Sequence, residues 1–375
     1  MTTDSMTQQV PESAHRLVKF GRESAFAKQL QERADRYFTD SGLPERDLPA
    51  MVRKTVVIWL WFLTSWAALV LLPTPWWLKL PLAVSLGLAI AGIGMAVMHD
   101  ANHGAYSRNP TVNRWVGYSL DAMGASSFIW RTKHNTLHHT WTNIGGMDDD
   151  LELGLLSRMS PHQKWLPMHR GQHIYMWVLY CLLLPKWVVF DDFYNIAIGR
   201  VGPLQLPKMT ARDWVVMLTG KALHITLGWV IPLLLYPWYF VVPMYFLVCA
   251  VVGVTLATTF QLAHCVSEAE MVPIPASGRL TDDWASHQLK TTVDFAPRNK
   301  FLSWYMGGLN FQVVHHLFPK VCHLHYPALA KLVEATAREN GLVYLVQPKL
   351  KGALHAHYAW LKTMGQRPVA PLAVA

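Results

Sequence analysis

The sequence predicts an all-α integral membrane protein, in which four transmembrane helices form two hairpins beneath a cytoplasmic helical cap. Three observations lead to this fold class. The composition is 52% hydrophobic and only 15% charged, which is unlike an ordinary soluble enzyme. Long apolar segments occur in two pairs, and the basic residues gather outside the short turn within each pair.

The first pair of apolar segments covers residues 55–72 and 81–98, and only the sequence PTPWWLKL separates them. Each segment has about 18 residues and would span roughly 27 Å as a helix, close to the thickness of a hydrocarbon core. Because the connection is short, we expect the two helices to run antiparallel as a hairpin over about residues 55–98.

The second hairpin is predicted at about residues 214–262, with its turn near residues 235–238. Tryptophan and proline occur at both turns, which is typical of the membrane interface. A shorter apolar segment, Ile174–Leu184, is followed at once by Pro185-Lys186. This segment could be a partial span, but we interpret it as an interfacial helix because it is interrupted so early.

Charge predicts the orientation of these helices. Lys79 is the single basic residue in the first turn, and the second turn has none. By the positive-inside rule, both termini and the middle loop are expected in the cytoplasm. The polar N-terminus lacks the apolar region of a signal peptide, so insertion is expected from internal segments. The net charge of +9 then fits an anionic membrane surface, and we expect no nucleic-acid partner.

The predicted domain organisation follows the apolar segments. A cytoplasmic N-terminal segment precedes the main domain and contains an amphipathic helix over Phe26–Phe38, which either lies on the membrane or packs on the cap. A second helix is predicted over Pro327–Glu339, stopped by Asn340-Gly341. The predicted units are residues 1–50 for the N-terminal segment, 51–345 for the main domain with its middle loop 99–213 and C-terminal cap 263–345, and 346–375 for a C-terminal tail.

Histidines gather at the predicted cytoplasmic ends of the apolar segments. The sequences HDANH, HNTLHH and QVVHH carry seven of them, and one more follows the fourth span in FQLAHC. The i, i+4 spacing in HDANH and HNTLHH predicts that each such pair shares one helical face. These eight residues are His99, His103, His134, His138, His139, His264, His315 and His316.

So many imidazoles at one membrane face predict a metal centre. Ionisable clusters at a membrane are costly and usually functional, and metal binding requires the neutral form of the ring. One zinc ion would use only half of the set, so eight nitrogens fit two ions with open positions. Imidazole binds zinc, copper, iron and nickel alike, which leaves the metal open. The four cysteines form no CxxC pair and add no such site.

Three acidic residues are candidates to fix the imidazole tautomers by hydrogen bonding, as outer partners of metal ligands do. They are Asp100, Asp148 and Asp150. For the run 148–150 the alternative is a solvated acidic loop. The remaining histidines are expected to have simpler roles. We expect His224 to be buried and hydrogen-bonded, His323 and His325 either to orient a loop or to act at the site, and the others to be at the surface, namely His162, His169, His173, His287, His355 and His357.

The sequences HDANHG, HNTLHHTWTN with GMDDD, and GGLNFQVVHHLFP resemble the three histidine boxes of the membrane fatty acid desaturases. The glutamine that opens the third box is similar to the front-end branch, which acts on acyl-CoA or acyl-lipid substrates, and the wider frame is similar to bacterial members. Val313-Val314 departs from the Ile-Glu common in front-end enzymes. The resemblance covers roughly residues 26–342 and implies a multi-pass protein, here expected in a bacterial cytoplasmic membrane.

The resemblance also implies a chemistry. Such enzymes hold two non-haem iron ions and use O2 and two electrons to introduce a double bond into a long acyl chain. The eight histidines match the ligands by position, and Gln312 stands where other branches have a histidine, as a weak ligand or a holder of water. We expect Trp130, Trp304 and Phe311 to line the acyl tunnel.

The electron donor is expected to be a separate protein. The chain lacks the HPGG haem signature of a fused cytochrome b5 domain and has no clustered cysteines for an iron–sulfur centre. A ferredoxin or a cytochrome b5 type of protein, with its reductase, would supply the electrons. The basic surface would fit an acidic partner.

Other functions share parts of this pattern. A di-iron membrane hydroxylase or a sphingolipid desaturase would use the same scaffold, and only the product distinguishes them. A metal transporter would place its ligands near the midplane of the bilayer, whereas these histidines lie at helix ends and in loops. A purely structural metal site would be closed with four ligands, fewer than the eight present here.

Overall fold

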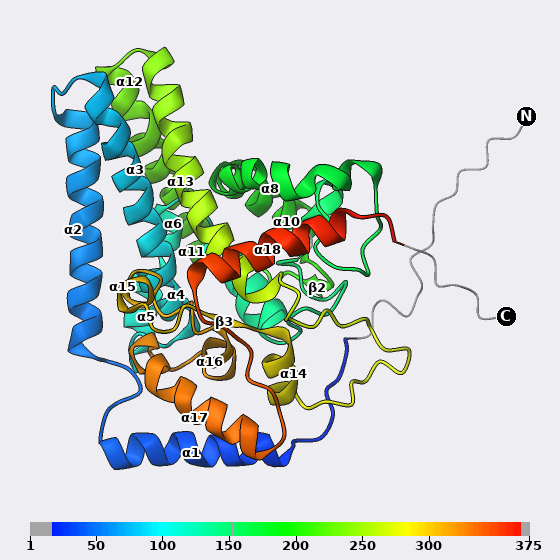
Figure 1. Cartoon of the computed structure of the whole chain (residues 1–375). Coiled ribbons are helices and arrows are strands. Elements are labelled where there is room, and N and C mark those ends of the chain that lie inside the picture. The colour runs from blue at the N-terminus through cyan, green and yellow to red at the C-terminus, as the bar shows by residue number, and fades with distance from the viewer. Residues whose placement is uncertain (1–16, 152, 369–375) are drawn as a thin grey trace, which may run out of the picture.

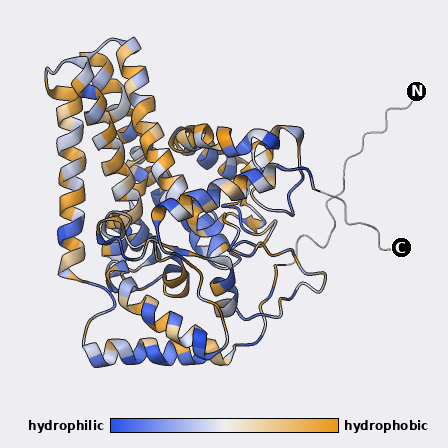
Figure 2. Cartoon of the chain, viewed as in Figure 1, coloured by the Kyte–Doolittle hydropathy of each residue, from blue (hydrophilic) through white to orange (hydrophobic). Residues whose placement is uncertain are grey.

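The computed structural model describes residues 17–151 and 153–368. Long helices form a bundle on one side, and shorter helices and loops form a cap beside and below it (Figure 1). Within the described residues, four helices are long and apolar enough to cross a membrane: Pro49–Leu71, Trp76–His103, Ala211–Leu235 and Trp238–His264. Figure 2 shows apolar residues along these helices and more polar residues in the cap.

The four long helices match the four predicted apolar segments, with longer ends. The second continues beyond residue 98 because His99–His103 keep helical geometry up to Gly104, whose left-handed φ of 76° ends the helix. Two of the long helices contain a π-helical turn. The elements are α2 (Pro49–Leu71), α3 (Trp76–Ile93), η2 (Gly94–Met98), α4 (His99–His103), α11 (Ala211–Ile225), η7 (Thr226–Val230), α12 (Ile231–Leu235) and α13 (Trp238–His264).

Polar contacts and close backbone approaches join the long helices. The hydroxyls of Ser65 on α2 and Ser85 on α3 lie 2.8 Å apart. A Cβ at Gly87 would lie 2.6 Å from the Cβ of Val251, so glycine lets α3 approach α13 closely. Lys79 is buried and donates to the carbonyls of Leu69 and Leu72, both at 2.7 Å, which satisfies the C-terminal end of α2.

The middle loop folds into short helices around the histidine-bearing end of the bundle. Within this loop, Pro167–Cys181 and Leu183–Ile198 are together long and apolar enough for one span, but they bend by 62° where they meet. This geometry is compatible with Ile174–Leu184 as a partial span and as an interfacial helix. The elements are α5 (Pro110–Gly117), α6 (Ser119–Ala122), α7 (Ser127–Trp130), η3 (Arg131–His138), η4 (Gly154–Leu156), η5 (Pro167–Gly171), α8 (Gln172–Cys181), α9 (Leu183–Lys186), η6 (Trp187–Asp191), α10 (Asp192–Ile198), β1 (Arg200–Val201) and β2 (Leu204–Gln205).

The C-terminal third forms the rest of the cap together with the N-terminal helix α1 (Ala25–Ser41). Phe26 and Leu30 of α1 are buried in one cluster with Leu329 and Val333, so α1 packs on the cap, as one of the two alternatives predicted (Figure 1). The remaining elements are α14 (Trp284–Thr291), β3 (Asp294–Phe295), α15 (Lys300–Tyr305), α16 (Gln312–Leu317), η8 (His323–His325), α17 (Tyr326–Glu339), β4 (Val346–Gln347) and α18 (Leu350–Gly365).

The segment expected to be a tail is folded over its described part. Strand β4 pairs in parallel with β3, so that Asp294 faces Val346. Helix α18 packs against α8 and α13, and its Ala353 and Leu361 are fully buried. The cap therefore continues beyond residue 345 to the end of α18.

Three histidines that we expected at the surface are buried, and the expectation was wrong for them: His169, His287 and His357. Each ring bonds to a backbone carbonyl distant in sequence. His357 Nδ1 donates to Cys265 at 2.8 Å, and the other two lie 2.9 and 2.8 Å from the carbonyls of Leu155 and Thr142. His162 and His355 are exposed, as expected, and His173 is half-buried. His224 is half-buried and bonds to the Tyr245 hydroxyl at 2.8 Å.

Candidate metal centre

Helix α4 presents the first two histidines of the site. His99 and His103 lie one turn apart at the C-terminal end of the second long helix, and their ring centroids are 4.7 Å apart. The π-helical turn η2 immediately precedes them. Such turns are rare and often occur at functional sites. The predicted shared face of this pair agrees with the structure.

The second sequence cluster contains the predicted pair and one pairing that ordinary helical spacing does not predict. Its residues lie in the π-helical segment η3 and at its end, where the N–H of His139 donates to the carbonyl of His134 at 3.1 Å. With this i→i−5 bond, residues five apart share a face. The Nε2 atoms of His134 and His139 accordingly lie 3.3 Å apart. The predicted pair His134 and His138 also lies on one side of the segment, with stacked rings whose centroids are 5.2 Å apart. The Nε2 of His138 in addition lies 3.2 Å from that of His316.

Helix α16 supplies the last two histidines of the centre. His315 and His316 are adjacent in sequence, so their side chains leave the helix in different directions. His315 faces the residues from α4 and η3, whereas His316 faces His138 and His264. One short helix therefore contributes to two neighbouring groups of imidazoles.

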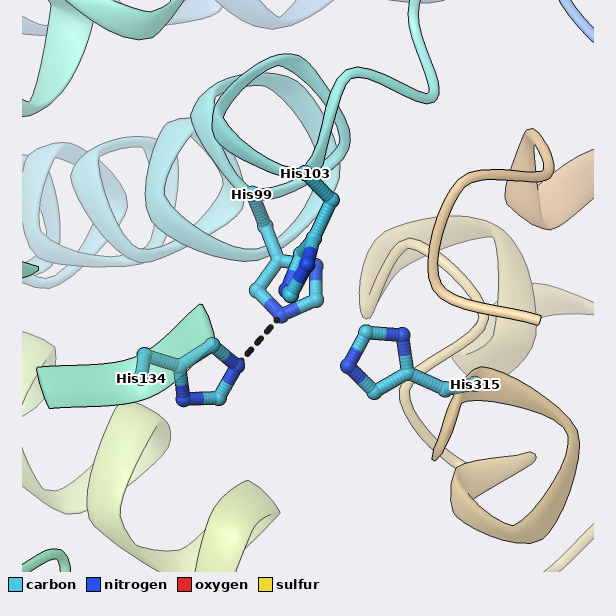
Figure 3. Close-up of side chains that lie close together, drawn as sticks. All are labelled: His99, His103, His134 and His315. Atoms are coloured by element: carbon cyan, nitrogen blue, oxygen red, sulfur yellow. Dashed lines mark hydrogen bonds between the residues drawn. The ribbon is translucent and has the colours of Figure 1, made fainter. Parts of the chain in front are cut away.

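The eight histidines gather into two groups, with His139 between them. In each group, one ligand atom per residue lies within 4.8 Å of the others. His139 forms a further such set with His315 and His316. The first histidine group is His99, His103, His134 and His315 (Figure 3), and the second histidine group is His138, His264 and His316.

Hydrogen bonds at Nδ1 orient several of these rings. His138 donates to Asp148 at 2.9 Å, and His134 contacts Asp150 at 3.3 Å. The other two bonds come from residues that sequence reasoning missed: His316 Nδ1 lies 2.8 Å from Gln288 Oε1, and His315 Nδ1 lies 3.1 Å from the Tyr326 hydroxyl. With Nδ1 engaged, Nε2 of each ring is free to bind a metal.

Several ring nitrogens at the centre are buried and have no partner in the protein. They are Nε2 of His103 and His315, Nδ1 of His139, and both nitrogens of His264. Buried polar atoms without a partner are uncommon and costly. Clustered imidazole nitrogens of this kind fit transition-metal ions, which bind neutral imidazole.

The electrostatics keep most of these rings neutral. Burial and neighbouring histidines hold the pKa of His139, His315 and His316 well below the usual value. Burial also lowers the pKa of His134, although Asp150 opposes the effect. For His138, burial lowers the pKa, but the carboxylates of Asp148 and Asp150 together raise it above the usual value. A set of neutral imidazoles is the form that a metal requires.

The three predicted acidic residues lie at two places. Asp148 and Asp150 contact histidines of the site, and Asp150 also lies 3.4 Å from Lys133. Asp100 does not bond to a histidine of either group. It accepts a bond from His323 Nδ1 at 2.8 Å, and Lys54 Nζ lies 2.7 Å from His323 Nε2. Sequence reasoning missed this buried Lys54–His323–Asp100 chain because its members come from three separate parts of the sequence.

A cavity of about 620 Å³ opens beside the first histidine group, between the histidine-bearing ends of the long helices and α8–α10. His99, His134 and Trp130 line it, and the Trp130 ring stacks on His134 at 4.4 Å. Gln312 also lines it, and its buried Oε1 has no partner. Gln261, which sequence reasoning did not single out, lies on the same wall with an unpartnered Oε1.

The structure places the other two predicted tunnel residues away from this cavity. Phe311 is buried in the cluster that α1, α14 and α17 share. Trp304 is 37% exposed on α15, with Lys54 Nζ 5.5 Å from its ring centroid. Neither is among the described residues that line the cavity.

Comparison with known proteins gives concordant results. A family profile described as fatty acid desaturase matches residues 74–348. A protein of Synechocystis sp. named sn-1 linoleoyl-lipid 6-desaturase is 37% identical over 354 residues, which cover 93% of this chain and 98% of the relative. A protein of the same name from Arthrospira platensis is 37% identical over 94% of this chain and 95% of the relative. An acyl-lipid (8-3)-desaturase of Physcomitrium patens is 34% identical over 90% of this chain and 71% of the relative.

Proposed function

This chain belongs to the fatty acid desaturase family, and we propose that it is a di-iron acyl-lipid desaturase of the front-end branch. The substrate is a long acyl chain carried on a membrane lipid. The enzyme uses O2 and two electrons from a separate donor protein. We propose position 6 for the new double bond, as in the names of the two cyanobacterial relatives.

The observation that carries the metal assignment is the pair of histidine groups joined by His139. Seven nitrogens in two groups and one shared ring fit two metal ions with open positions. We assign the ligand role to His99, His103, His134, His138, His139, His264, His315 and His316. Their unpartnered nitrogens are explained if metal ions bind there. Iron is the metal that the family implies, and its chemistry matches imidazole ligands.

The reaction balances as one acyl CH2–CH2 unit, one O2, two electrons and two protons giving one CH=CH unit and two water molecules. When bound, the iron ions supply the oxidising power that removes hydrogen from an unactivated chain. The protein orients the ligands and holds the substrate. Asp148 and Gln288 fix two of the rings through Nδ1, so that Nε2 faces the metal position.

The cavity beside the first histidine group supports an acyl substrate. Leucines, Trp130 and Phe260 dominate its wall and would exclude water from the chain. We propose that Trp130 contacts the acyl chain beside His134. The carboxamides of Gln312 and Gln261 face this space without protein partners for their oxygens. They would hold a water molecule at the boundary between the chain and the metal ions.

We propose that the four long helices span a bacterial cytoplasmic membrane as two hairpins, with both termini and the histidine groups on the cytoplasmic side. The positive-inside rule supports this orientation, since Lys79 is the single basic residue at the far turn of the first hairpin, where carbonyls of Leu69 and Leu72 accept its hydrogen bonds. Residues 51–345 would form the catalytic domain, with α1 and α18 completing its cap.

The test is expression of the chain in a host with a defined lipid profile, beside a His315→Ala/His316→Ala variant. Fatty acids are analysed by gas chromatography with mass spectrometry, and double bonds are located from disulfide adducts. We expect a new unsaturated acid with the wild-type chain only, and two iron ions per purified chain. A hydroxylated product would support the hydroxylase alternative, and purified protein without iron or product would contradict the proposal.

A further inference from the structure

A short N-terminal segment crosses the cap beside the loop at residues 277–282. The N–H of Lys19 donates to Gly278 at 3.0 Å, and the N–H of Leu280 donates back to Lys19 at 2.8 Å. A Cβ at Gly21 would lie 2.2 Å from the carbonyl oxygen of Thr281. Glycine at this position therefore lets the two segments run in close contact.

This pair of segments presents three exposed cations, which we call the basic patch: Lys19, Arg22 and Arg279. Arg279 Nη1 donates to the carbonyl of Phe20 at 3.3 Å, which holds the guanidinium over the neighbouring segment. Among nearby acids, Glu23 is exposed, whereas Asp282 is paired with Lys290 at 2.5 Å. The patch thus keeps an excess of positive charge.

An aromatic and hydrogen-bonded route leads inward from the basic patch. The half-buried ring of Phe20 lies 5.3 Å from the ring of His287, and His287 Nε2 donates to the carbonyl of Thr142 at 2.8 Å. The Thr142 hydroxyl lies 3.2 Å from His316 Nδ1. Three contacts therefore connect the surface ring to the second histidine group, and His287 and Thr142 are both buried.

The position of this route fits an electron entry rather than a substrate entry. It reaches the second histidine group, whose members do not line the described cavity. The cavity lies beside the first histidine group, where a bound acyl chain would exclude a partner. A donor at the basic patch and a substrate in the cavity would not compete for space.

We propose that the basic patch docks an acidic one-electron carrier protein, and that Phe20, His287 and Thr142 form the path for its electrons to the second histidine group. This inference rests on the proposed desaturase function. Two carriers are each oxidised by one electron per turnover, and the two electrons are consumed with two protons in the reduction of O2 to water. Opposite charge on the partner steers the encounter and makes its rate depend on salt.

The test measures, by stopped-flow, the rate at which a reduced acidic [2Fe–2S] ferredoxin reduces the iron-loaded protein. The patch variant is Lys19→Glu/Arg22→Glu/Arg279→Glu, and the matched control reverses three exposed cations on α1 and α17, Lys28→Glu/Arg36→Glu/Lys331→Glu. We expect the patch variant to lose at least about tenfold in rate at low salt and most of its salt dependence, while the control keeps both. Equal rates for the two variants would overturn the docking site.

Two further measurements separate docking from the electron path and from the proposed function. Phe20→Ala should slow reduction by the carrier without lowering the yield of carbodiimide cross-links. Phe20→Trp, which keeps an aromatic ring, should be reduced at the wild-type rate. An unchanged rate in Phe20→Ala would overturn the path. Cross-linking also works on iron-free protein, where the patch variant should lose the link. If wild type reduced with dithionite makes no product, the proposed function fails, while the cross-linking result still decides the docking site.

Discussion

The first and second histidine groups differ in what surrounds them. His99 and His134 of the first group line a large cavity, and the face of Trp130 lies against His134. In the second group, the rings of His138 and His316 bond to buried Asp148 and Gln288. The first group is therefore open to a ligand from the bundle side, whereas the second is enclosed by polar side chains of the cap.

This difference indicates a division of work within one centre. Under the proposed function, the acyl chain enters the cavity that the open group faces, so the environment of this group would govern binding of the substrate. The enclosed group lies behind fixed hydrogen bonds and at the inner end of the route from the basic patch. Changes near the first group should alter use of the substrate, and changes near the second should alter metal affinity and electron entry.

The strongest test of this division is the residue that belongs to both sides. His139 Nε2 lies 3.3 Å from His134 Nε2, and its ring stacks on His316 at 4.3 Å. We expect His139→Ala to lose more than about 100-fold in desaturation and to bind less than one iron per chain. Product analysis and metal analysis of the purified protein measure both, and exposed His355→Ala serves as the control. Retention of both irons would show that the two groups do not share this ring.

Replacing Asp148 or Asp150 should distinguish the two histidine groups by a smaller effect, on metal affinity. Asp148 is fully buried and bonds to His138 of the second group. Asp150 is shared between His134 of the first group and Lys133. Loss of such an outer partner typically costs about 10–100-fold in metal affinity. We expect Asp148→Asn to approach the upper end of this range and Asp150→Asn the lower end, as judged by iron retention against a chelator. An equal loss in both variants would contradict the difference in enclosure.

A change on the cavity side should act on the substrate alone. We expect Trp130→Ala to raise the KM for the lipid substrate by about tenfold while iron content stays unchanged, because the ring lines the cavity but offers no ligand. Kinetics with lipid substrate in nanodiscs measure this. Trp304→Ala is the matched control, since Trp304 lies outside the cavity. If the two variants behave alike, the cavity is not the substrate site.

Much of the centre was predictable from the sequence because it depends on residue type and on local spacing. Apolar segments of sufficient length marked the four long helices, and the positions of the histidines at their ends predicted that the imidazoles would meet. The pair His99 and His103 followed ordinary helical spacing. These features need only the helical repeat and the cost of placing polar groups in a membrane.

The parts that could not be predicted depend on departures from that repeat and on distant contacts. The π-helical geometry of η3 pairs His134 with His139, and neither propensity nor spacing signals such a turn. The burial of His287 and the pairing of Asp100 with His323 require knowledge of how the cap folds. Side chains such as Gln288 and Tyr326 carry no motif, and only their positions next to His316 and His315 reveal a role.

The smallest effect is expected at the support of the second group. His357 Nδ1 donates to the carbonyl of Cys265, next to His264, and Nε2 lies 2.9 Å from the Tyr180 hydroxyl. Burial lowers the pKa of His357 to about 4, against a usual value of 6.5. The unfolded chain therefore binds this proton at a higher pH than the folded chain does. Stability from this residue is present above pH 6.5 and is lost as the pH falls towards 4.

Replacing this ring should flatten the pH dependence of stability. The free energy of unfolding of the wild type should fall between pH 7 and pH 4. In His357→Gln, this fall should be smaller by on the order of 2 kcal/mol. Melting temperatures of the iron-free protein in detergent, measured across this range, would show a smaller decrease than in wild type. Exposed His355→Gln should leave the wild-type decrease in place. If both variants showed the wild-type decrease in melting temperature, His357 would not be held neutral. The buried surroundings of the second group would then not include the His357 side chain on α18.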